Sequence, residues 1–285
     1  METNKSTILR VFFKKILVNI FYKGVQPFLF IYLRIFNRKG LHVYCHNPTI
    51  ETCENIIDCM NNTRRRFELL SDLKGLNYAD GVFYFSLDDG WRDNLKVIDL
   101  LNAKGIKPFL FISSNSSNRG VLWTDVLRGL GYKESEVSLL KRQPNSKVQN
   151  LLAQIKLDST PRKLMSLEDL YIIAGKCQIG LHTANHPILT NCDRETITKE
   201  ISDNRIGLKG FDYFNFLAYP NGNYNKIVAD VCRDKKIRYA FTTSKRYDTE
   251  SLEMAMPRVC IPNESTKAEV YARLSGLHDM IRLCV

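Results

Sequence analysis

From about residue 40 onward, short apolar runs alternate along the chain with longer stretches in which apolar residues recur every three or four positions. The short runs are typical of buried strands and the longer stretches of amphipathic helices. Strands are expected at residues 41–46, 82–87, 107–112, 177–181, 215–219, 237–242 and 257–261. Helices are expected at residues 63–76, 92–104, 163–174, 193–209 and 224–235.

This alternation predicts parallel strands with helices packed outside them. Seven strands in this order favour an α/β fold of the distorted (β/α)7 barrel type over an open Rossmann sheet. No glycine-rich dinucleotide or Walker motif is present, which argues against nucleotide binding. Residues 113–162 interrupt the rhythm with a turn-rich loop at 113–118 and one or two short helices over 124–160. We interpret this stretch as an insertion at one face of the barrel that shapes a substrate groove.

The first 40 residues have a pattern of their own. Pairs of large apolar residues recur every four positions from residue 8 to residue 21, as on one broad helical face. Gly24 and Pro27 are expected to break this helix before a second apolar run at 28–36. The chain is therefore divided into a basic amphipathic N-terminal segment, 1–40, and a barrel, 41–285, that contains the insertion.

The positive charge is concentrated in the same segment. Residues 1–40 carry eight basic side chains and one acidic one, or +7 of the formal net charge of +11. Neither apolar run reaches the ~20 residues needed to span a bilayer, and no A-x-A cleavage site is present. Residues 7–37 are interpreted as a helical hairpin or pair of helices on an anionic membrane surface. The alternative is a helical cap packed on the barrel, with solvated lysines.

Composition sets further bounds. Hydrophobic residues make up 44% of the chain and charged residues 25%, as in globular proteins. Because the positive charge is interleaved with large aliphatic residues, a nucleic-acid partner is not expected. The eight cysteines contain no C-x-x-C pair, which favours a reducing compartment. The expected location is the cytoplasm, in association with the inner face of the membrane.

Two polar motifs follow expected strands. An aspartate pair, Asp88 and Asp89, ends the strand at 82–87, and His182 and His186 follow the strand at 177–181. In parallel barrels the functional loops leave the carboxyl ends of the strands, so these groups should converge on one rim. Two histidines four residues apart on a helical turn can grip one metal ion together with a carboxylate. The second carboxylate is then free to act as a base on a water molecule.

These motifs resemble those of the polysaccharide deacetylase family, the NodB-homology or carbohydrate esterase 4 group. Residues 86–94 resemble the family motif T-F-D-D-G with its continuation Y-x-D-N. Residues 182–189 resemble H-[ST]-x-x-H-P followed by leucine, and residues 216–224 resemble the F-x-Y-P-x-G motif of one branch. The resemblance covers roughly residues 41–262.

The resemblance implies roles for individual residues. Asp88 matches the general base, and Asp89 matches the metal ligand beside His182 and His186. The metal is expected to be zinc or another divalent first-row ion. The backbone N–H of Asn221 matches a donor to the oxyanion.

The chain departs from the family pattern in two places. Leu217 stands where many members have an arginine that orients the base, so another residue must orient Asp88. The late general-acid histidine has no clean counterpart, because His278 has the wrong spacing. Arg258 resembles a late strand residue of the branch that could contact Asp88 or substrate.

Several other residues are candidates with structural alternatives. His46 resembles an early Y-H pair and either lines the site or makes a structural hydrogen bond. Tyr219 and Pro220, in the third motif, are expected to contact substrate. Trp91 and Trp123 could stack on sugar rings, although core packing is the default for either.

The resulting hypothesis is a metal-dependent hydrolase. It would remove an N-acetyl group from an amino sugar in a polysaccharide or a lipid-linked glycan intermediate. One alternative is a deformylase of a lipid-linked formamido sugar. Another is a catalytically inactive barrel that binds glycan.

Overall fold

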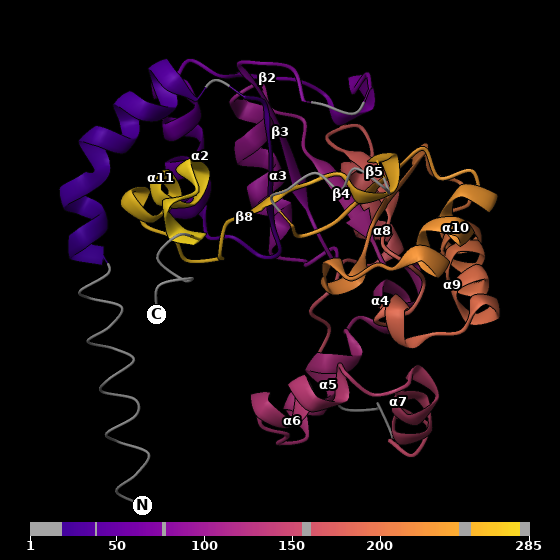
Figure 1. Ribbon diagram of the computed structural model, residues 1–285. Helices are drawn as coiled ribbons and strands as arrows, with labels where there is room; N and C mark the ends of the chain where they lie inside the picture. Colours follow the sequence, from indigo (N-terminus) through magenta and orange to yellow (C-terminus); the bar gives the residue numbers. More distant parts are fainter. Residues whose placement is uncertain (1–18, 38, 76–77, 156–160, 245–251, 280–285) are drawn as a thin grey trace, which may run out of the picture.

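The computed structural model describes residues 19–37, 39–75, 78–155, 161–244 and 252–279. Its centre is a curled parallel sheet with helices around the outside (Figure 1), as the alternating pattern predicts. All seven expected strands are present, together with a short additional one, β2. The strands are β1 (Leu41–Cys45), β2 (Arg66–Phe67), β3 (Val82–Leu87), β4 (Phe109–Ile112), β5 (Gln178–Leu181), β6 (Tyr213–Ala218), β7 (Tyr239–Phe241) and β8 (Val259–Cys260).

The strand order is β7-β6-β5-β4-β3-β1-β8, with β2 beside β3, and every pairing is parallel. The chain just before β8 brings the two edges of this sheet together. The Met256 N–H donates to the Ala240 carbonyl at 2.8 Å, and the Thr242 N–H donates to the Met256 carbonyl at 3.0 Å. Residues 256–260 therefore join β7 to β1, and the fold is a distorted (β/α) barrel.

Both faces of the sheet are buried, which explains why the strands read as continuous apolar runs. Along β4, Phe109 and Phe111 lie in an aromatic cluster inside the barrel, whereas Leu110 and Ile112 belong to the larger cluster beneath the helices. The same alternation along β3 places Tyr84 inside and Phe85 outside. Because successive side chains of a strand point to opposite faces, each of these strands contributes both to the aromatic cluster and to the larger cluster.

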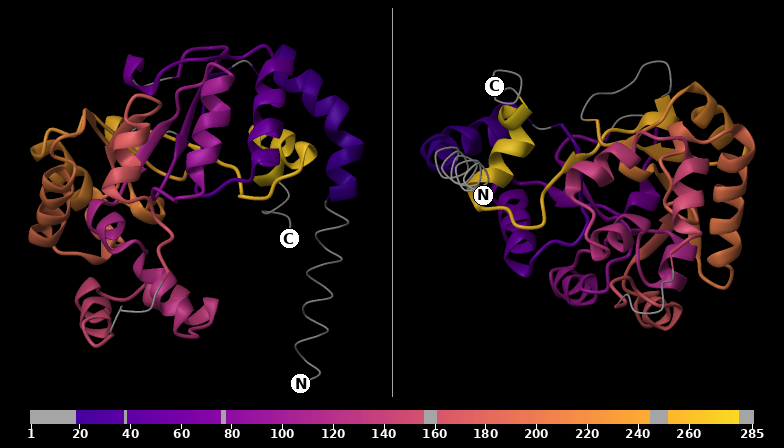
Figure 2. Two further views of the ribbon diagram at one scale, coloured as in Figure 1. Left: turned by 180° about the vertical axis from the view of Figure 1, so that it is seen from behind. Right: turned by 90° about the horizontal axis from the view of Figure 1, so that it is seen from below.

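Besides the N-terminal helix, the described residues contain ten α-helices, most of which pack around the outside of the barrel (Figures 1 and 2). They are α2 (Ile50–Asn62), α3 (Asn94–Ala103), α4 (Ser114–Arg119), α5 (Trp123–Gly129), α6 (Glu134–Leu140), α7 (Asn145–Leu152), α8 (Leu167–Ile173), α9 (Arg194–Gly207), α10 (Lys226–Asp234) and α11 (Lys267–Ser275). α3, α8, α9 and α10 agree with the expected helices.

The helix expected at 63–76 is wrong, and α2 takes its place further upstream. Thr49 caps α2 by accepting the Thr52 N–H, and buried side chains at Cys53, Ile56 and Met60 give it a core-facing stripe. Arg64 then adopts a left-handed φ of 56°, which ends the helix. The chain that follows is held extended because β2 pairs with β3.

The insertion at 113–162 also differs in detail. Its serine- and asparagine-rich start forms α4, which ends at Gly120 with a φ of 86°. Its described residues after Gly120 contain three short helices, α5, α6 and α7, instead of one or two. These helices extend away from the barrel, below it in Figure 1.

The N-terminal segment is not broken at Gly24 and Pro27. Residues 19–31 form one helix, which continues into the π-helical turn Tyr32–Phe36. Pro27 lies on the exposed side, where the backbone carbonyl that loses its donor can be hydrated. Residues 7–18 of the expected hairpin lie outside the described residues. No helix in the described part of the chain has the length and apolarity to cross a membrane.

Candidate active site

The carboxylate half of the site lies in the turn after β3. Asp88 and Asp89 are both buried, and the backbone turns sharply because Asp89 and Gly90 have φ values of 74° and 81°. A Cβ at Gly90 would lie 2.7 Å from the end of the Ile112 side chain, and the φ of 81° is strained for other residues, so glycine is favoured here. The strand therefore delivers both carboxylates to its carboxyl end.

The histidine half lies after β5, two strands away in the sheet. The sequence suggested a helical turn between His182 and His186, but the structure has no helix there. Instead, Thr183 and His186 adopt left-handed φ values of 62° and 59°. This irregular loop brings the two rings to within 4.8 Å of each other, measured between centroids.

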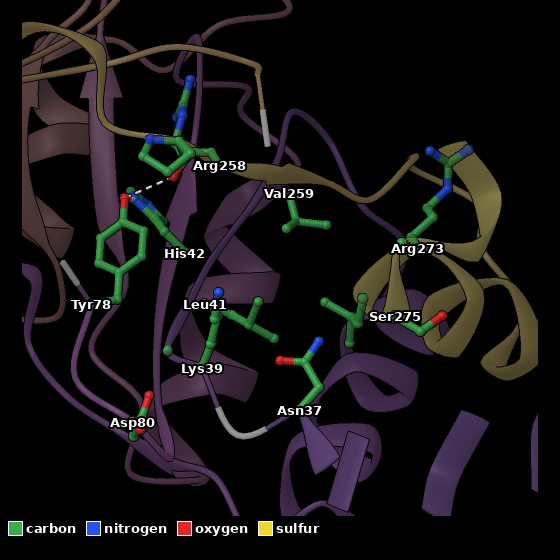
Figure 3. Close-up of a pocket in the computed structure, with 14 residues that line it drawn as sticks. Asn37, Lys39, Leu41, His42, Tyr78, Asp80, Arg258, Val259, Arg273 and Ser275 are labelled. Carbon is green, nitrogen blue, oxygen red and sulfur yellow. Dashed lines mark hydrogen bonds between the residues drawn. The ribbon is translucent and has the colours of Figure 1, made fainter. Parts of the chain in front are cut away.

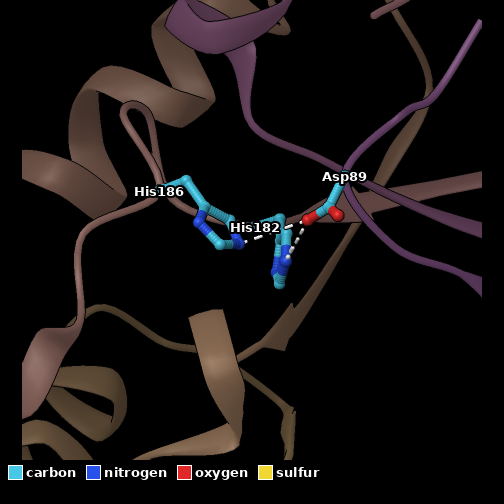
Figure 4. A group of neighbouring side chains, drawn as sticks. All are labelled: Asp89, His182 and His186. Carbon is cyan, nitrogen blue, oxygen red and sulfur yellow. Dashed lines mark ion pairs between the residues drawn. The ribbon is translucent and has the colours of Figure 1, made fainter. Parts of the chain in front are cut away.

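Figure 4 shows the rings of the two histidines directed at the same carboxylate oxygen of Asp89. The Nε2 atoms of His182 and His186 each lie 3.2 Å from Asp89 Oδ1. The three ligand atoms lie within 4.8 Å of one another. Asp89 Oδ1 is buried, and no group in the described residues hydrogen-bonds to it. An ion between the three would satisfy this atom, and two imidazoles with one carboxylate are a donor set suited to zinc.

Neighbouring groups fix the ligands in orientation. The Trp91 indole N–H donates to Asp89 Oδ2 at 2.9 Å. His182 Nδ1 lies 2.7 Å from the Ala218 carbonyl, and because a carbonyl only accepts, Nδ1 carries the proton and Nε2 offers its lone pair. The hydrogen bond from the Trp91 indole favours the ionised form of the Asp89 carboxyl group. The carboxylate is thus kept ionised for a cation.

Asp88 is held from the far end of the sequence by Arg258. The guanidinium donates to Oδ1 at 2.8 Å and to Oδ2 at 2.9 Å, and both side chains are buried. Arg258 also donates to the Thr242 carbonyl at 3.2 Å and lies 4.1 Å from the centre of the Tyr44 ring. A bidentate pair of this kind fixes the plane of the carboxylate. Arg258 therefore orients Asp88, a role that the apolar side chain of Leu217 cannot perform.

A buried polar chain continues from this pair down the inside of the barrel. Arg258 contacts Ser86 Oγ at 3.5 Å, and His42 Nε2 lies 2.8 Å from the same oxygen. Tyr78 donates to the Pro257 carbonyl and lies 3.3 Å from His42 Nδ1. Burial, with the charge of Arg258, holds the pKa of His42 well below its ordinary value. No local pattern in the sequence marks Ser86, His42 and Tyr78 as members of this polar chain.

The polar chain leads to a second cavity, whose lining includes His42, Tyr78 and Arg258 (Figure 3). This cavity has a volume of about 610 Å³, and the start of β1 and the end of α11 contribute to its wall. It does not reach the metal ligands, none of which is among its lining residues.

The cavity that contains Asp88, Asp89 and both histidines has a volume of about 250 Å³. Five other candidates line it: His46, Trp91, Trp123, Tyr219 and Asn221. Asn221 has a left-handed φ of 59°. The two tryptophans have structural partners, since the Trp123 N–H donates to the His186 carbonyl at 3.0 Å and that of Trp91 to Asp89.

The insertion forms part of the same wall. α5 and the chain after α6 contribute three charged residues that no motif marked, Asp125, Arg128 and Lys141. Arg128 and Lys163 lie 3.4 and 3.5 Å from Asp125 Oδ1. In the sequence, only the position of the insertion, directly after the strand that forms β4, indicated that it would contribute to the wall of the cavity.

Three candidates are buried or lie apart from the cavity. Tyr219 lines the cavity, but most of its side chain is buried and its hydroxyl donates to the Met254 carbonyl at 2.8 Å. Pro220 is also buried and is not among the lining residues. His278 lies outside the cavity, where its Nδ1 is 2.6 Å from the Tyr22 hydroxyl.

Comparison with known proteins agrees with this geometry. The family model for polysaccharide deacetylase matches residues 76–240, more than half of the chain. The chain belongs to the polysaccharide deacetylase family. No curated protein sequence gave a significant match.

Solved structures share the fold at low identity. IcaB from Ammonifex degensii has 13% identity and a TM-score of 0.59, over 84% of this chain and 96% of IcaB. The Streptococcus pyogenes deacetylase PplD, solved with acetate, has 13% identity and a TM-score of 0.55, over 82% and 96%. A de-N-acetylase from Aggregatibacter actinomycetemcomitans has 12% identity and a TM-score of 0.51, over 82% and 98%. The distorted barrel of this chain is therefore the fold of known deacetylases.

Proposed function

We propose that this polysaccharide deacetylase removes an N-acetyl group from an amino sugar in a polysaccharide or a lipid-linked glycan intermediate. The observation that carries the proposal is the convergence of Asp89, His182 and His186 beside Asp88, which Arg258 clamps, in one cavity. The three ligands would hold a divalent ion, and we propose zinc. When bound, such an ion polarises the acetamide carbonyl and makes a water molecule more acidic.

The residues of the chain supply the proton transfer and its geometry. Asp88 accepts the proton of the attacking water, and the Arg258 fork holds its carboxylate in one orientation. The backbone N–H of Asn221 donates to the carbonyl oxygen as negative charge develops on it. The amide C–N bond then breaks, giving acetate and the free amine of the sugar.

The departing amine needs a proton donor. Among the described histidines that line the cavity, His182 and His186 serve as ligands, which leaves His46. Its backbone carbonyl accepts the Asn94 side-chain N–H at 2.8 Å, which fixes the turn after β1. We therefore assign proton donation to His46 in place of His278.

The test is release of acetate from lipid-linked N-acetylhexosamines by the purified, zinc-loaded protein. Asp89→Ala should lose both metal and activity. Asp88→Asn should keep about one metal per chain and lose activity, because only the base is removed. Formate in place of acetate, from a formamido sugar, would support the deformylase instead. A metal-loaded protein that binds such sugars and releases neither acid would reject hydrolysis.

A further inference from the structure

The N-terminal helix has two apolar faces, and only one of them is used within the chain. The inner face packs on the barrel: Tyr22 lies against Ala268 and Ala272 of α11, and Leu33 belongs to the main core. The Phe30 ring meets the Tyr271 ring at 6.5 Å between centroids. Both Figures 1 and 2 show the helix at the outer edge of the molecule, beside α11.

The outer face is a stripe of large exposed hydrophobic residues. The described residues contain fourteen such side chains, and seven of them lie in this one helix. These seven, which we call the outer stripe, are Ile20, Phe21, Phe28, Ile31, Tyr32, Ile35 and Phe36. The two most exposed are Phe28, at 72%, and Phe36, at 75%. Large apolar side chains gathered in this way on one exposed helix mark an interaction site.

The helix is fixed rigidly enough to present this stripe. Arg65, which follows α2, donates to the backbone carbonyls of Leu33 and Asn37 at the end of the helix. Tyr22, on the inner face, pairs with His278, and Asn19 Oδ1 accepts from Thr266 Oγ1 at 3.1 Å. The stripe therefore has one orientation relative to the barrel.

Charge identifies the partner. No aspartate or glutamate occurs between residues 3 and 50, whereas Lys23, Arg34 and Lys39 accompany the stripe. In a symmetric dimer through this face, the cations of both copies would be brought together without acidic partners. An anionic lipid surface neutralises them while it buries the apolar side chains. Because the inner face is committed to α11, the helix would lie in the plane of the surface.

We propose that the outer stripe docks the enzyme on an anionic lipid bilayer, with the barrel held at a fixed orientation to the membrane. This inference concerns binding alone and goes beyond the proposed hydrolysis. It makes a substrate on a lipid carrier accessible to the enzyme at the surface where that substrate resides.

Sedimentation with vesicles of phosphatidylglycerol and phosphatidylcholine tests the proposal, with the full-length protein and no substrate. Wild type should bind these vesicles, bind pure phosphatidylcholine more weakly, and be released at about 1 M salt, where screening reduces the Debye length to about 3 Å. Phe28→Glu with Ile35→Glu should weaken binding about tenfold or more, because two apolar contacts are lost. The matched control, Leu139→Glu with Ile206→Glu, changes two exposed residues elsewhere and should bind like wild type.

A second measurement does not depend on loss of binding. The tryptophan introduced by Phe28→Trp should show a blue shift of its fluorescence emission on anionic vesicles. The tryptophan introduced by Phe214→Trp, on β6, should show no such shift. Unchanged binding in the stripe variant, or no binding by wild type, would overturn the proposal. So would a wild-type dimer that becomes a monomer in the stripe variant. Acetate release is measured separately, so failure of docking and failure of the proposed function are distinguishable.

Discussion

Arg258 and Asp88, 170 positions apart in the chain, form two hydrogen bonds of 2.8 and 2.9 Å inside the barrel. The pair exists because residues 256–260 join the last edge of the sheet to β1 and so carry Arg258 beneath the turn that ends β3. The proposed base is therefore oriented by the strand that closes the fold.

This relationship predicts the effect of Arg258→Lys. Lysine keeps the positive charge but cannot form the fork, so Asp88 loses its fixed plane. We expect kcat to fall about 10- to 100-fold, as for a catalytic group that is misplaced by about 1 Å. Metal content should stay at the wild-type level. Arg273→Lys on α11 is the matched control, and a kcat equal in both variants would refute the orienting role.

Trp91→Phe should weaken metal binding. The ring is retained, but the N–H that donates to Asp89 Oδ2 at 2.9 Å is removed. Loss of an outer hydrogen bond to a metal ligand typically costs about 10- to 100-fold in affinity. Competition with a zinc chelator measures the change. Tyr171→Phe, on the exposed surface of α8, should leave the affinity unaltered.

Metal binding should stabilise the fold, because the ligand set is assembled only in the native chain. At a zinc concentration about 1,000 times Kd the gain is about 4 kcal/mol, which corresponds to a rise in Tm on the order of 10 °C. Calorimetry with and without chelator measures it. His182→Ala should abolish the rise, whereas His278→Ala should retain it, since that ring lies outside the cavity. Equal shifts in both variants would place the metal elsewhere.

His42 should make the protein sensitive to acid. Its pKa is held well below 6.5 by burial and by Arg258, so below pH 6.5 the unfolded chain takes up a proton that the folded chain does not. Stability is then lost as the pH falls from about 6.5, by up to about 1.4 kcal/mol per pH unit for this one group.

Urea unfolding of wild type and His42→Gln over this pH range isolates the contribution of His42. The variant should have the shallower dependence of unfolding free energy on pH. Parallel dependences would mean that the pKa of His42 is the same in the folded and the unfolded protein.

The sequence by itself determined the strands, the family and the chemical identity of the ligands. These features come from local patterns, each of which is complete within about ten residues. The strands appear as apolar runs because both faces are buried, and the ligands appear in the aspartate and histidine motifs. Because parallel strands align their carboxyl ends, the same patterns also placed the aspartates and histidines on one rim.

Only the tertiary structure decided how distant segments meet. The extended chain at β2 is imposed by β3 against the local tendency that suggested a helix. The convergence of His182 and His186 depends on left-handed residues in a loop, and the partners of Asp88 and Asp89 come from Arg258 and Trp91. Likewise, the periodicity of the N-terminal segment showed that it is amphipathic, but packing on α11 selected which apolar face is buried and which remains exposed. These outcomes depend on long-range packing, which the spacing of residues along one segment does not encode.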